Sequence, residues 1–429
     1  MTLKNQALPT RTFPRLVSKN HLHRALAHEE SHANFMTTPL AQSKPRFPIQ
    51  DECIYLNHCG ISPLHPAAAA AARQWDETHM RSGIGVFAKL GDPTLAVRRA
   101  AAQLLEVPLD DLSFLRNTAE GLSLVANGLP LEPGDRIVSY LHEYPSNHYP
   151  WRLQATRGAT LELLPDRPCG SGLPEGQPRG FELEDLERLL RAGRVRAVAL
   201  SHVQFTSGFM VDLDAVGRLC RQHDAWLIVD AAQSLGAIPL RPLQWGVDAI
   251  AASGWKWLLG PIGSGLLYTS PRLRAALKCT MAGADLMEQG DDYLNHAWQP
   301  HRDGRFFEYS TAHMGSASAL AACIQEIQLH FGPEPIATET SRLRQLLRER
   351  LDPDRFPRVQ FPGPGGPILS WAVPQADRVA RRATKSGVTV TQRGGYLRTA
   401  PHFYNTDDEI LRAVDVLHEA VDAVQRDTA

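Results

Sequence analysis

Two residues that could together hold a nitrogen-containing cofactor stand near the middle of the chain, each after an apolar run. Asp230 closes the run 226–229 (WLIV), and Lys256 follows the small-residue run 249–254 (AIAASG). A carboxylate at the carboxyl end of a buried strand lies where open α/β sheets bind ligands, and an ionised carboxylate can keep a pyridine nitrogen protonated. The alternative is that Asp230 caps a helix. Gln233 would then either reach an oxygen of the same ring or lie solvated in the first helical turn.

Aromatic residues stand beside the lysine and at a second possible cofactor contact. Lys256 is flanked by Trp255 and Trp257. An amine surrounded by aromatic side chains is partly desolvated, so its pKa falls and the neutral form that makes an imine is favoured. The alternative is a surface lysine, which most lysines are. Tyr144 follows another expected strand, where its ring could stack on a flat heterocycle, although aromatic residues more often pack in cores and turns.

A phosphate group would find a site at the start of the helix expected over residues 118–128. A helix N-terminus offers free N–H groups and the positive end of the helix dipole. Ser253 could supply a further contact, and the alternative is an ordinary capping arrangement that involves Glu120. The residues that would surround the phosphate at this turn are Asn117, Thr118 and Ala119.

The elements that position these residues alternate between helix and strand from about residue 92 to residue 270, as a parallel sheet covered by helices requires. The expected strands are short apolar runs that suit burial on both faces: 136–140, 159–164, 197–202, 226–230 and 249–252. The expected helices are 93–106, 118–128, 213–223, 316–330, 339–350 and 407–425, the last with Thr406 as its N-cap. The predicted fold class is therefore α/β, a mostly parallel central sheet covered by helices, with a smaller α+β C-terminal domain.

The same pattern divides the chain into four parts. Residues 1–35, which lack the apolar stretch of a secretory signal, are expected to be a flexible tail. Residues 36–67 are expected to join the small domain to the active site, residues 68–315 to form the large domain, and residues 316–429 to form the small C-terminal domain. The Gly- and Pro-rich stretch 166–182 is expected to be a loop.

Composition excludes several classes of function. Lys plus Arg number 45 and Asp plus Glu 46, so nothing in the charge attracts nucleic acid or an anionic membrane. No apolar run reaches the roughly 18 residues of a membrane-spanning helix. The six cysteines show no C-x-x-C spacing, which predicts no metal site and favours a reducing, cytoplasmic setting.

Taken together, these segments resemble the class V aminotransferase superfamily of fold type I, whose cofactor is pyridoxal 5′-phosphate (PLP). That superfamily includes cysteine desulfurases, isopenicillin N epimerase and kynureninase. The resemblance runs from about Ile54 to the C-terminus, through the segments YLNH (55–58), NTAEG (117–121), SGWK (253–256) and LRTAPHFYNT (397–406). It implies a PLP Schiff base on Lys256 and a phosphate contact from Ser253. It further implies contacts of Asp230 with the pyridine nitrogen, of Gln233 with the phenolic oxygen and of Tyr144 with the ring face.

The resemblance also implies where a substrate and a partner subunit would bind. Arg398 matches an arginine that pairs with the substrate α-carboxylate, for which a planar guanidinium is suited; the alternative is a structural salt bridge. Asn57 and His58 lie in the segment that resembles the N-terminal active-site loop, and we expect them at the substrate. Thr311 matches a residue that lends its hydroxyl to the phosphate of a neighbouring subunit, which implies a homodimer with active sites at the subunit interface.

Two departures from the family pattern bear on the reaction. The residue before the Schiff-base lysine is commonly histidine in the family and is Trp255 here, so one phosphate contact is lost or replaced. Cysteine desulfurases carry a nucleophilic cysteine shortly before the substrate arginine, whereas no cysteine lies between Lys385 and Arg398. Persulfide chemistry on the protein is therefore not expected, and Cys59, in a different loop, is expected to be a small buried residue.

The resulting prediction is a PLP enzyme that acts on an amino acid or related amine, with aminotransferase as the main expectation. Lys256 would move the Cα proton as general base and acid. Transamination, epimerisation and elimination share these first steps, so an epimerase or a C–S or C–C lyase is the alternative. From another class, a non-catalytic PLP-fold binding protein stays open.

Overall fold

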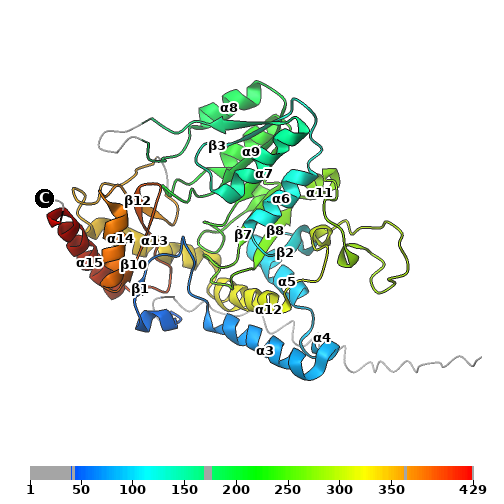
Figure 1. Ribbon diagram of the computed structural model, residues 1–429, viewed down its shortest axis with the longest axis horizontal. Coiled ribbons are helices and arrows are strands. Elements are labelled where there is room, and N and C mark those ends of the chain that lie inside the picture. Colours follow the sequence, from blue (N-terminus) through cyan, green and yellow to red (C-terminus); the bar gives the residue numbers. More distant parts are fainter. Residues whose placement is uncertain (1–39, 41–43, 169–175, 362–364, 428–429) are drawn as a thin grey trace, which may run out of the picture. The chain divides into compact units, whose positions relative to one another are not determined.

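A seven-stranded sheet forms the centre of the structure, a computed structural model that describes residues 40, 44–168, 176–361 and 365–427 (Figure 1). The expected tail 1–35 and part of the loop expected at 166–182 lie outside the described residues. The strands of the sheet, in spatial order, are β2 (Leu112–Leu115), β8 (Gly265–Thr269), β7 (Ala249–Ser253), β6 (Trp226–Asp230), β5 (Val195–Ser201), β3 (Arg136–Tyr140) and β4 (Thr160–Leu164).

Most neighbours in this sheet run parallel. β4, β3, β5, β6 and β7 pair in parallel, and β8 lies antiparallel between β7 and β2. Because the parallel strands point the same way, their last residues Tyr140, Ser201, Asp230 and Ser253 reach one edge of the sheet, called here the carboxyl edge. The predicted α/β class with a mostly parallel sheet is confirmed; the short strands β2 and β8 were not predicted.

Helices cover both faces of the sheet. Along β6, Ile228 packs into one hydrophobic cluster with α6 and α11, while Leu227 and Val229 pack into another with α5, α9 and α12. This alternation buries both faces of each strand, which explains the continuous apolar runs. The helices around the sheet are α3 (Pro66–Ser82), α4 (Val86–Leu90), α5 (Pro93–Leu105), α6 (Thr118–Gly128), α7 (Tyr149–Leu153), α8 (Leu183–Arg191), α9 (Leu213–Gln222), α10 (Pro242–Trp245), α11 (Pro271–Ala276) and α12 (Met314–Cys323).

The C-terminal part of the chain has its own sheets and core. β11 (Thr391–Arg393), β12 (Tyr396–Thr399) and β9 (Leu369–Trp371) form an antiparallel sheet, and β1 (Ile54–Tyr55) pairs in parallel with β10 (Val388–Thr389). Ile54 and Leu56 belong to the same hydrophobic cluster as the C-terminal helices, so the N-terminal segment packs on the C-terminal part. These helices are α13 (Pro333–Arg350), α14 (Ala376–Lys385) and α15 (Asp407–Arg426). The predicted domain bounds stay a prediction.

Two helix predictions show how far local signals reach. α15 starts where predicted, because the Thr406 side chain accepts from the Glu409 N–H and the Glu409 side chain accepts from the Thr406 N–H. The helix predicted over 316–330 instead ends as an α-helix at Cys323 and continues as a π-helix over Ile324–Leu329. Such a change depends on packing and leaves no local signal.

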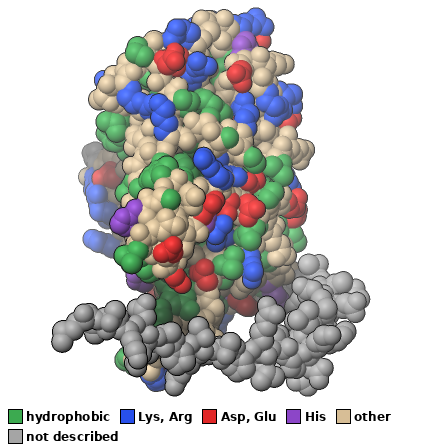
Figure 2. All heavy atoms as spheres, turned by 90° about the vertical axis from the view of Figure 1, so that its right-hand side faces the viewer, with side chains coloured by type: hydrophobic (Ala, Val, Ile, Leu, Met, Phe, Trp, Pro, Cys, Tyr) green, Lys and Arg blue, Asp and Glu red, His purple; other side chains and the backbone are tan. Residues whose placement is uncertain are grey.

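The described surface carries charges of both signs. On the face in Figure 2, Lys and Arg side chains alternate with Asp and Glu side chains and with apolar patches. Among the helices of the described chain, none combines the length and hydropathy that a membrane-spanning helix needs.

Candidate active site

The carboxyl edge of the sheet brings Asp230 and Lys256 together. Asp230 is the last residue of β6 and is buried, and its Oδ1 accepts from the Ala232 N–H at 2.9 Å. Turns rather than a helix follow β6, so Asp230 does not cap a helix there. Burial raises the pKa of Asp230, while the nearby Lys256 ammonium lowers it. The carboxylate thus keeps one oxygen for a cationic partner, as a pyridinium nitrogen would be.

Lys256 lies in the turn after β7, deep enough for its amine to be desolvated. Burial lowers its pKa, and the charge of Asp230 acts in the opposite direction. Its Nζ lies 5.5 Å from the centre of the Tyr144 ring. The Trp257 indole is fully buried and donates to Gln233 Oε1 at 3.1 Å. The desolvation predicted for Lys256 is therefore present, and Tyr144 is the ring that faces the amine.

The predicted phosphate turn is assembled from two separate elements. Asn117 is the N-cap of α6, and its side chain accepts from the Glu120 N–H at 2.9 Å. The Thr118 hydroxyl lies 2.8 Å from Ser253 Oγ, and the Thr118 N–H donates to that oxygen at 3.2 Å. The structure thus brings the end of β7 to the N-terminus of α6. Asn117 thus makes the capping arrangement considered as the alternative, and phosphate binding by the two hydroxyls and the Ala119 N–H stays a prediction.

Arg398, in β12, is a buried guanidinium without an acidic partner among the described residues. Its exposed fraction is 2%, its Nη1 donates to the Phe205 carbonyl oxygen, and its Nε has no hydrogen-bond partner among the described residues. Burial lowers its pKa, while Cys59 and Tyr144 lie close enough to act on that pKa in the opposite direction. The structural salt bridge considered as the alternative is absent from the described chain. A buried arginine with unused donors is suited to a ligand carboxylate.

Residues 57–59 of the N-terminal segment contact residues of the site. The Cys59 carbonyl accepts from Gln233 Nε2 at 2.8 Å, and the Cys59 thiol contacts Asn57 Oδ1 at 3.6 Å. His58 is buried, and its ring nitrogens lie 2.7 Å from the Ala400 oxygen and 2.7 Å from the Tyr404 hydroxyl. Both nitrogens of His58 are therefore engaged within the protein, and its contact with substrate stays a prediction, as does that of Asn57.

Glu143 is a site residue to which the sequence assigned no role. It is buried and accepts from the Ser201 N–H at 2.7 Å, from the Ser201 hydroxyl and from Gln204 Nε2 at 2.9 Å. Burial raises its pKa to about 7. Because Glu143 precedes Tyr144 in the chain, these bonds fix the backbone that carries the Tyr144 ring. The one sequence signal for this role was its position beside Tyr144 in the segment EYPSN. Its hydrogen-bond partners lie in β5 and in the turn after β5, which local sequence does not reveal.

Comparison with known proteins decides the family. The family model "Aminotransferase class-V" matches residues 71–370. The chain belongs to this family. A probable cysteine desulfurase from Pyrococcus abyssi is 27% identical over 352 residues, which cover 76% of this chain and 83% of that protein. The uncharacterized aminotransferase YcbU from Bacillus subtilis is 26% identical over 380 residues, which cover 87% of this chain and 96% of that protein.

Solved structures share the fold of this class V chain. A complex of the cystine C–S lyase C-DES with its reaction product cysteine persulfide superposes with a TM-score of 0.77 at 22% identity. The match covers 88% of this chain and 99% of that one. The predicted fold is therefore confirmed.

PLP is the cofactor of this class V enzyme, and the residues at the carboxyl edge fit it. Lys256 offers a desolvated amine, Asp230 a carboxylate for the pyridine nitrogen, and Tyr144 a ring above the amine. The Gln233 side chain is held by Cys59 and Trp257 and keeps one N–H for a further acceptor. The contacts assigned to the individual residues stay predictions.

Thr311 lies apart from these residues. It is exposed, and its hydroxyl donates to Asp285 Oδ2 at 3.4 Å. It lines a cleft of about 900 Å³ together with Arg116 and Glu120, which flank the phosphate turn. The predicted role of Thr311 toward a neighbouring subunit stays a prediction.

Proposed function

We propose that this class V protein is a PLP-dependent lyase that breaks the Cβ–S bond of cysteine or of a cysteine derivative. The observation that carries the amino-acid part is Arg398, whose buried guanidinium has an unused donor and no acidic partner in the described chain. The relatives named cysteine desulfurase and the structural neighbour named cystine C–S lyase support sulfur chemistry.

Each polar residue has one task in this proposal. Arg398 would bind the substrate α-carboxylate. Tyr144, whose ring lies beside the Lys256 amine, would cover one face of the PLP ring. Lys256, whose pKa is lowered chiefly by burial, takes the proton from Cα and returns a proton later. PLP, when bound, supplies an electron sink for the bonds at Cα. Asp230 would hold the pyridine nitrogen of bound PLP in its protonated form, and the sulfur would then leave Cβ as the thiolate.

The segment before Arg398 supports a lyase that needs no protein thiol. β11 and β12 form a hairpin in which Arg393 pairs with Tyr396, so only Gly394 and Gly395 form the turn. Both glycines have positive φ, 58° and 83°, as two-residue hairpin turns require. So short a turn leaves no loop to carry a nucleophilic cysteine over the site. Elimination from cysteine plus one water then yields pyruvate, ammonia and hydrogen sulfide.

Product analysis distinguishes the possible reactions of the purified holoenzyme. With L-cysteine or L-cystine, we expect pyruvate and ammonia in equal amounts, together with sulfide or persulfide. A desulfurase would instead form alanine. An aminotransferase would form the oxo acid without releasing ammonia or sulfide, and would leave the cofactor in its amine form. Alanine or the amine form as the main product would contradict the proposed elimination.

Cys59 provides a second test, because it is the described cysteine that acts electrostatically on both Lys256 and Arg398. Cys59→Ala should keep the rate of pyruvate release within about threefold, since elimination uses no protein thiol. Loss of turnover in this variant, with PLP still bound, would instead assign sulfur transfer to the Cys59 thiol.

We also infer that the chain forms a homodimer around the cleft that contains Thr311. Ile84 and Tyr293 line this cleft and are 84% and 67% exposed, a large apolar exposure that a second copy would cover. Light scattering should give twice the mass of the chain. A monomer at micromolar concentration would contradict the dimer and leave Thr311 without its role.

A further inference from the structure

Three arginines line one small cavity on the C-terminal part of the chain. Arg344 and Arg348 lie one helical turn apart on α13, and Arg358 forms a β-bridge with Trp371 beside β9. The cavity has a volume of about 120 Å³, and Ser207 also lines it. A larger cleft of about 840 Å³ shares Arg348 and Arg358. Arg348 is exposed, so the cavity reaches the described surface.

These arginines have no acidic partner within the described residues. Arg344 Nη1 donates to the Gly365 carbonyl oxygen at 2.7 Å, and no ion pair joins any of the three to an acid in the described chain. Burial and the charges of Arg348 and Arg358 lower the pKa of Arg344 to about 10. Burial and Arg348 likewise lower the pKa of Arg358. Like charges thus repel across the cavity without a compensating carboxylate.

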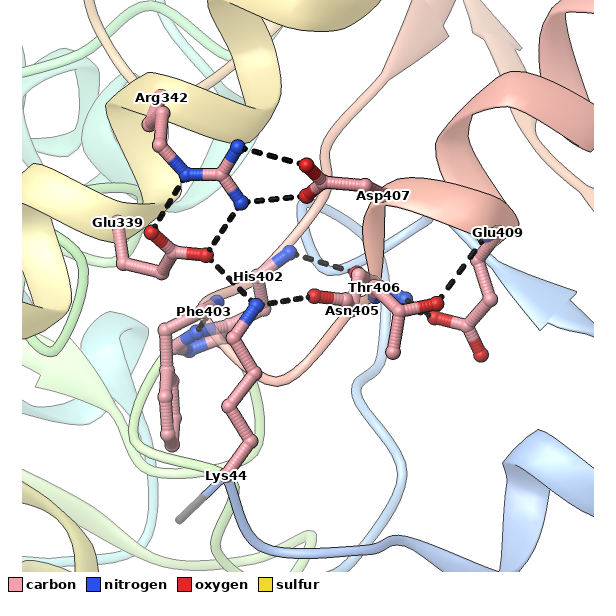
Figure 3. Close-up of polar contacts among 9 residues, drawn as sticks. All are labelled: Lys44, Glu339, Arg342, His402, Phe403, Asn405, Thr406, Asp407 and Glu409. Carbon is pink, nitrogen blue, oxygen red and sulfur yellow. Dashed lines mark hydrogen bonds and ion pairs between the residues drawn. The ribbon is translucent and has the colours of Figure 1, made fainter. Parts of the chain in front are cut away.

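Arg342, on the same helix, shows the contrast. It donates to both Glu339 oxygens, each at 2.8 Å, and it also pairs with Asp407 (Figure 3). The pairing of Arg342 holds α13 to the start of α15. Arg344 and Arg348 share this helix, but within the described residues neither they nor Arg358 have such a partner, so a structural ion pair does not explain them.

The surrounding cleft does not neutralise the excess charge. Arg167 and Arg179 also line the larger cleft, where each already pairs with an acid, Glu182 and Asp166. Guanidinium groups present planar donor pairs that match the oxygens of phosphate or a carboxylate. An anion with at least two negative charges is therefore the ligand whose charge and acceptor oxygens the cavity complements.

We propose that Arg344, Arg348 and Arg358 form a binding site for a small phosphate dianion, separate from the PLP phosphate site. The ligand is either free phosphate or the phosphate group of a small monoester. Ser370, which lines the cavity, pairs with Arg398 across β9 and β12. Its hydroxyl donates to the Thr206 carbonyl oxygen at 2.6 Å, so the cavity lies next to the strand that carries Arg398. The proposal does not depend on the reaction that the active site performs.

The test is a calorimetric titration of the PLP-saturated holoenzyme with inorganic phosphate, with ionic strength held constant by chloride. PLP saturation matters because an empty cofactor site would itself bind phosphate. We expect saturable binding to the wild type and an affinity at least about tenfold lower in Arg348→Gln and in Arg358→Gln, because each loses a charged donor to the anion. Arg350→Gln, an exposed arginine of the same helix outside the cavity, should bind like the wild type.

The outcomes separate the site from a general charge effect. Equal weakening in Arg348→Gln and Arg350→Gln, or no saturable binding above the chloride control, would overturn the proposal. Unchanged affinity in both cavity variants would overturn it as well. A parallel titration with glycerol 3-phosphate identifies the source: binding comparable to that of phosphate indicates a monoester, and much weaker binding indicates the free anion.

Discussion

The candidate site at the carboxyl edge of the central sheet differs from the amino edge in how its charged residues are paired. At the amino edge, acids just before the strands are paired with arginines: Asp111 with Arg274 at 2.7 Å, Asp135 with Arg194 at 3.2 Å and Asp248 with Arg272 at 2.8 Å. At the carboxyl edge, Asp230, Glu143, Lys256 and the nearby Arg398 have no ion pair within the described chain. All of them are partly or fully buried.

Burial without a partner is costly, so the difference between the edges is informative. An unpaired buried charge lowers stability unless a ligand or a changed protonation state compensates. The pKa of Asp230 is raised and those of Lys256 and Arg398 are lowered, each chiefly by burial. The amino edge therefore serves stability, and the carboxyl edge is built around groups that a cofactor and a substrate must complete.

The largest expected effect comes from Lys256→Ala. Loss of the amine removes both covalent attachment of PLP and the proton carrier, so turnover should fall by at least about a thousandfold. Borohydride reduction followed by peptide mass spectrometry should find PLP on the Lys256 peptide of the wild type and on no peptide of the variant. Trapping on another lysine in the variant would place the attachment elsewhere.

Arg274→Gln tests the amino edge. Arg274 also donates to the Thr269 and Arg302 carbonyl oxygens, and its removal leaves the Asp111 carboxylate buried without its cation. We expect the free energy of unfolding to fall by about 3–5 kcal/mol, with kcat/KM unchanged for the folded enzyme. Urea denaturation measures the free energy of unfolding, and steady-state kinetics measure kcat/KM. Arg194→Gln, whose side chain is 59% exposed, is the control and should cost less than about 1 kcal/mol.

Arg398→Gln tests the carboxyl edge by the same substitution. Because this arginine has no acidic partner in the described chain, the unfolding free energy should stay level or rise. Loss of the carboxylate contact should lower kcat/KM about a hundredfold, the equivalent of about 2.7 kcal/mol. Arg398→Lys should recover only part of this, since an ammonium cannot bind in a bidentate manner. A loss of stability as large as that of Arg274→Gln would show that the two edges do not differ.

Local signals predicted the parts of the site that lie on single elements. The apolar run ending at Asp230 appears where the sequence placed it, and Asn117 caps α6, as in the capping arrangement that was the alternative to a phosphate turn. Local sequence could not predict which aromatic ring faces Lys256. That ring belongs to Tyr144, which is distant in sequence, whereas the adjacent Trp257 donates to Gln233. β2 and β8 were missed because short apolar runs beside glycines and loops carry no clear period. Whether an arginine has a partner depends on folding of the whole chain.

The smallest expected effect concerns Glu143 and pH. Burial raises its folded-state pKa to about 7, above the ordinary 4.5, so the folded protein binds this proton more tightly than the unfolded chain. Its contribution to stability is therefore full below about pH 4.5, falls as pH rises toward 7 and then levels off. Glu143→Gln cannot ionise, so its stability relative to the wild type should improve between pH 5 and pH 8 by on the order of 1–3 kcal/mol. Urea midpoints at the two pH values measure this change.

Ser201→Ala is the matched control, because the Ser201 hydroxyl donates to Glu143 and favours its charged form. Removing that donor should raise the pKa of Glu143 further and move the pH-dependent loss of stability to higher pH. Glu143→Gln should instead abolish this pH-dependent loss. Glu308, a further acid whose pKa burial raises to about 7, is unchanged in both variants and contributes equally to each. An equal dependence of the unfolding free energy on pH in the wild type and Glu143→Gln would mean that Glu143 stays in one protonation state. The contrast between the two edges would then not include Glu143.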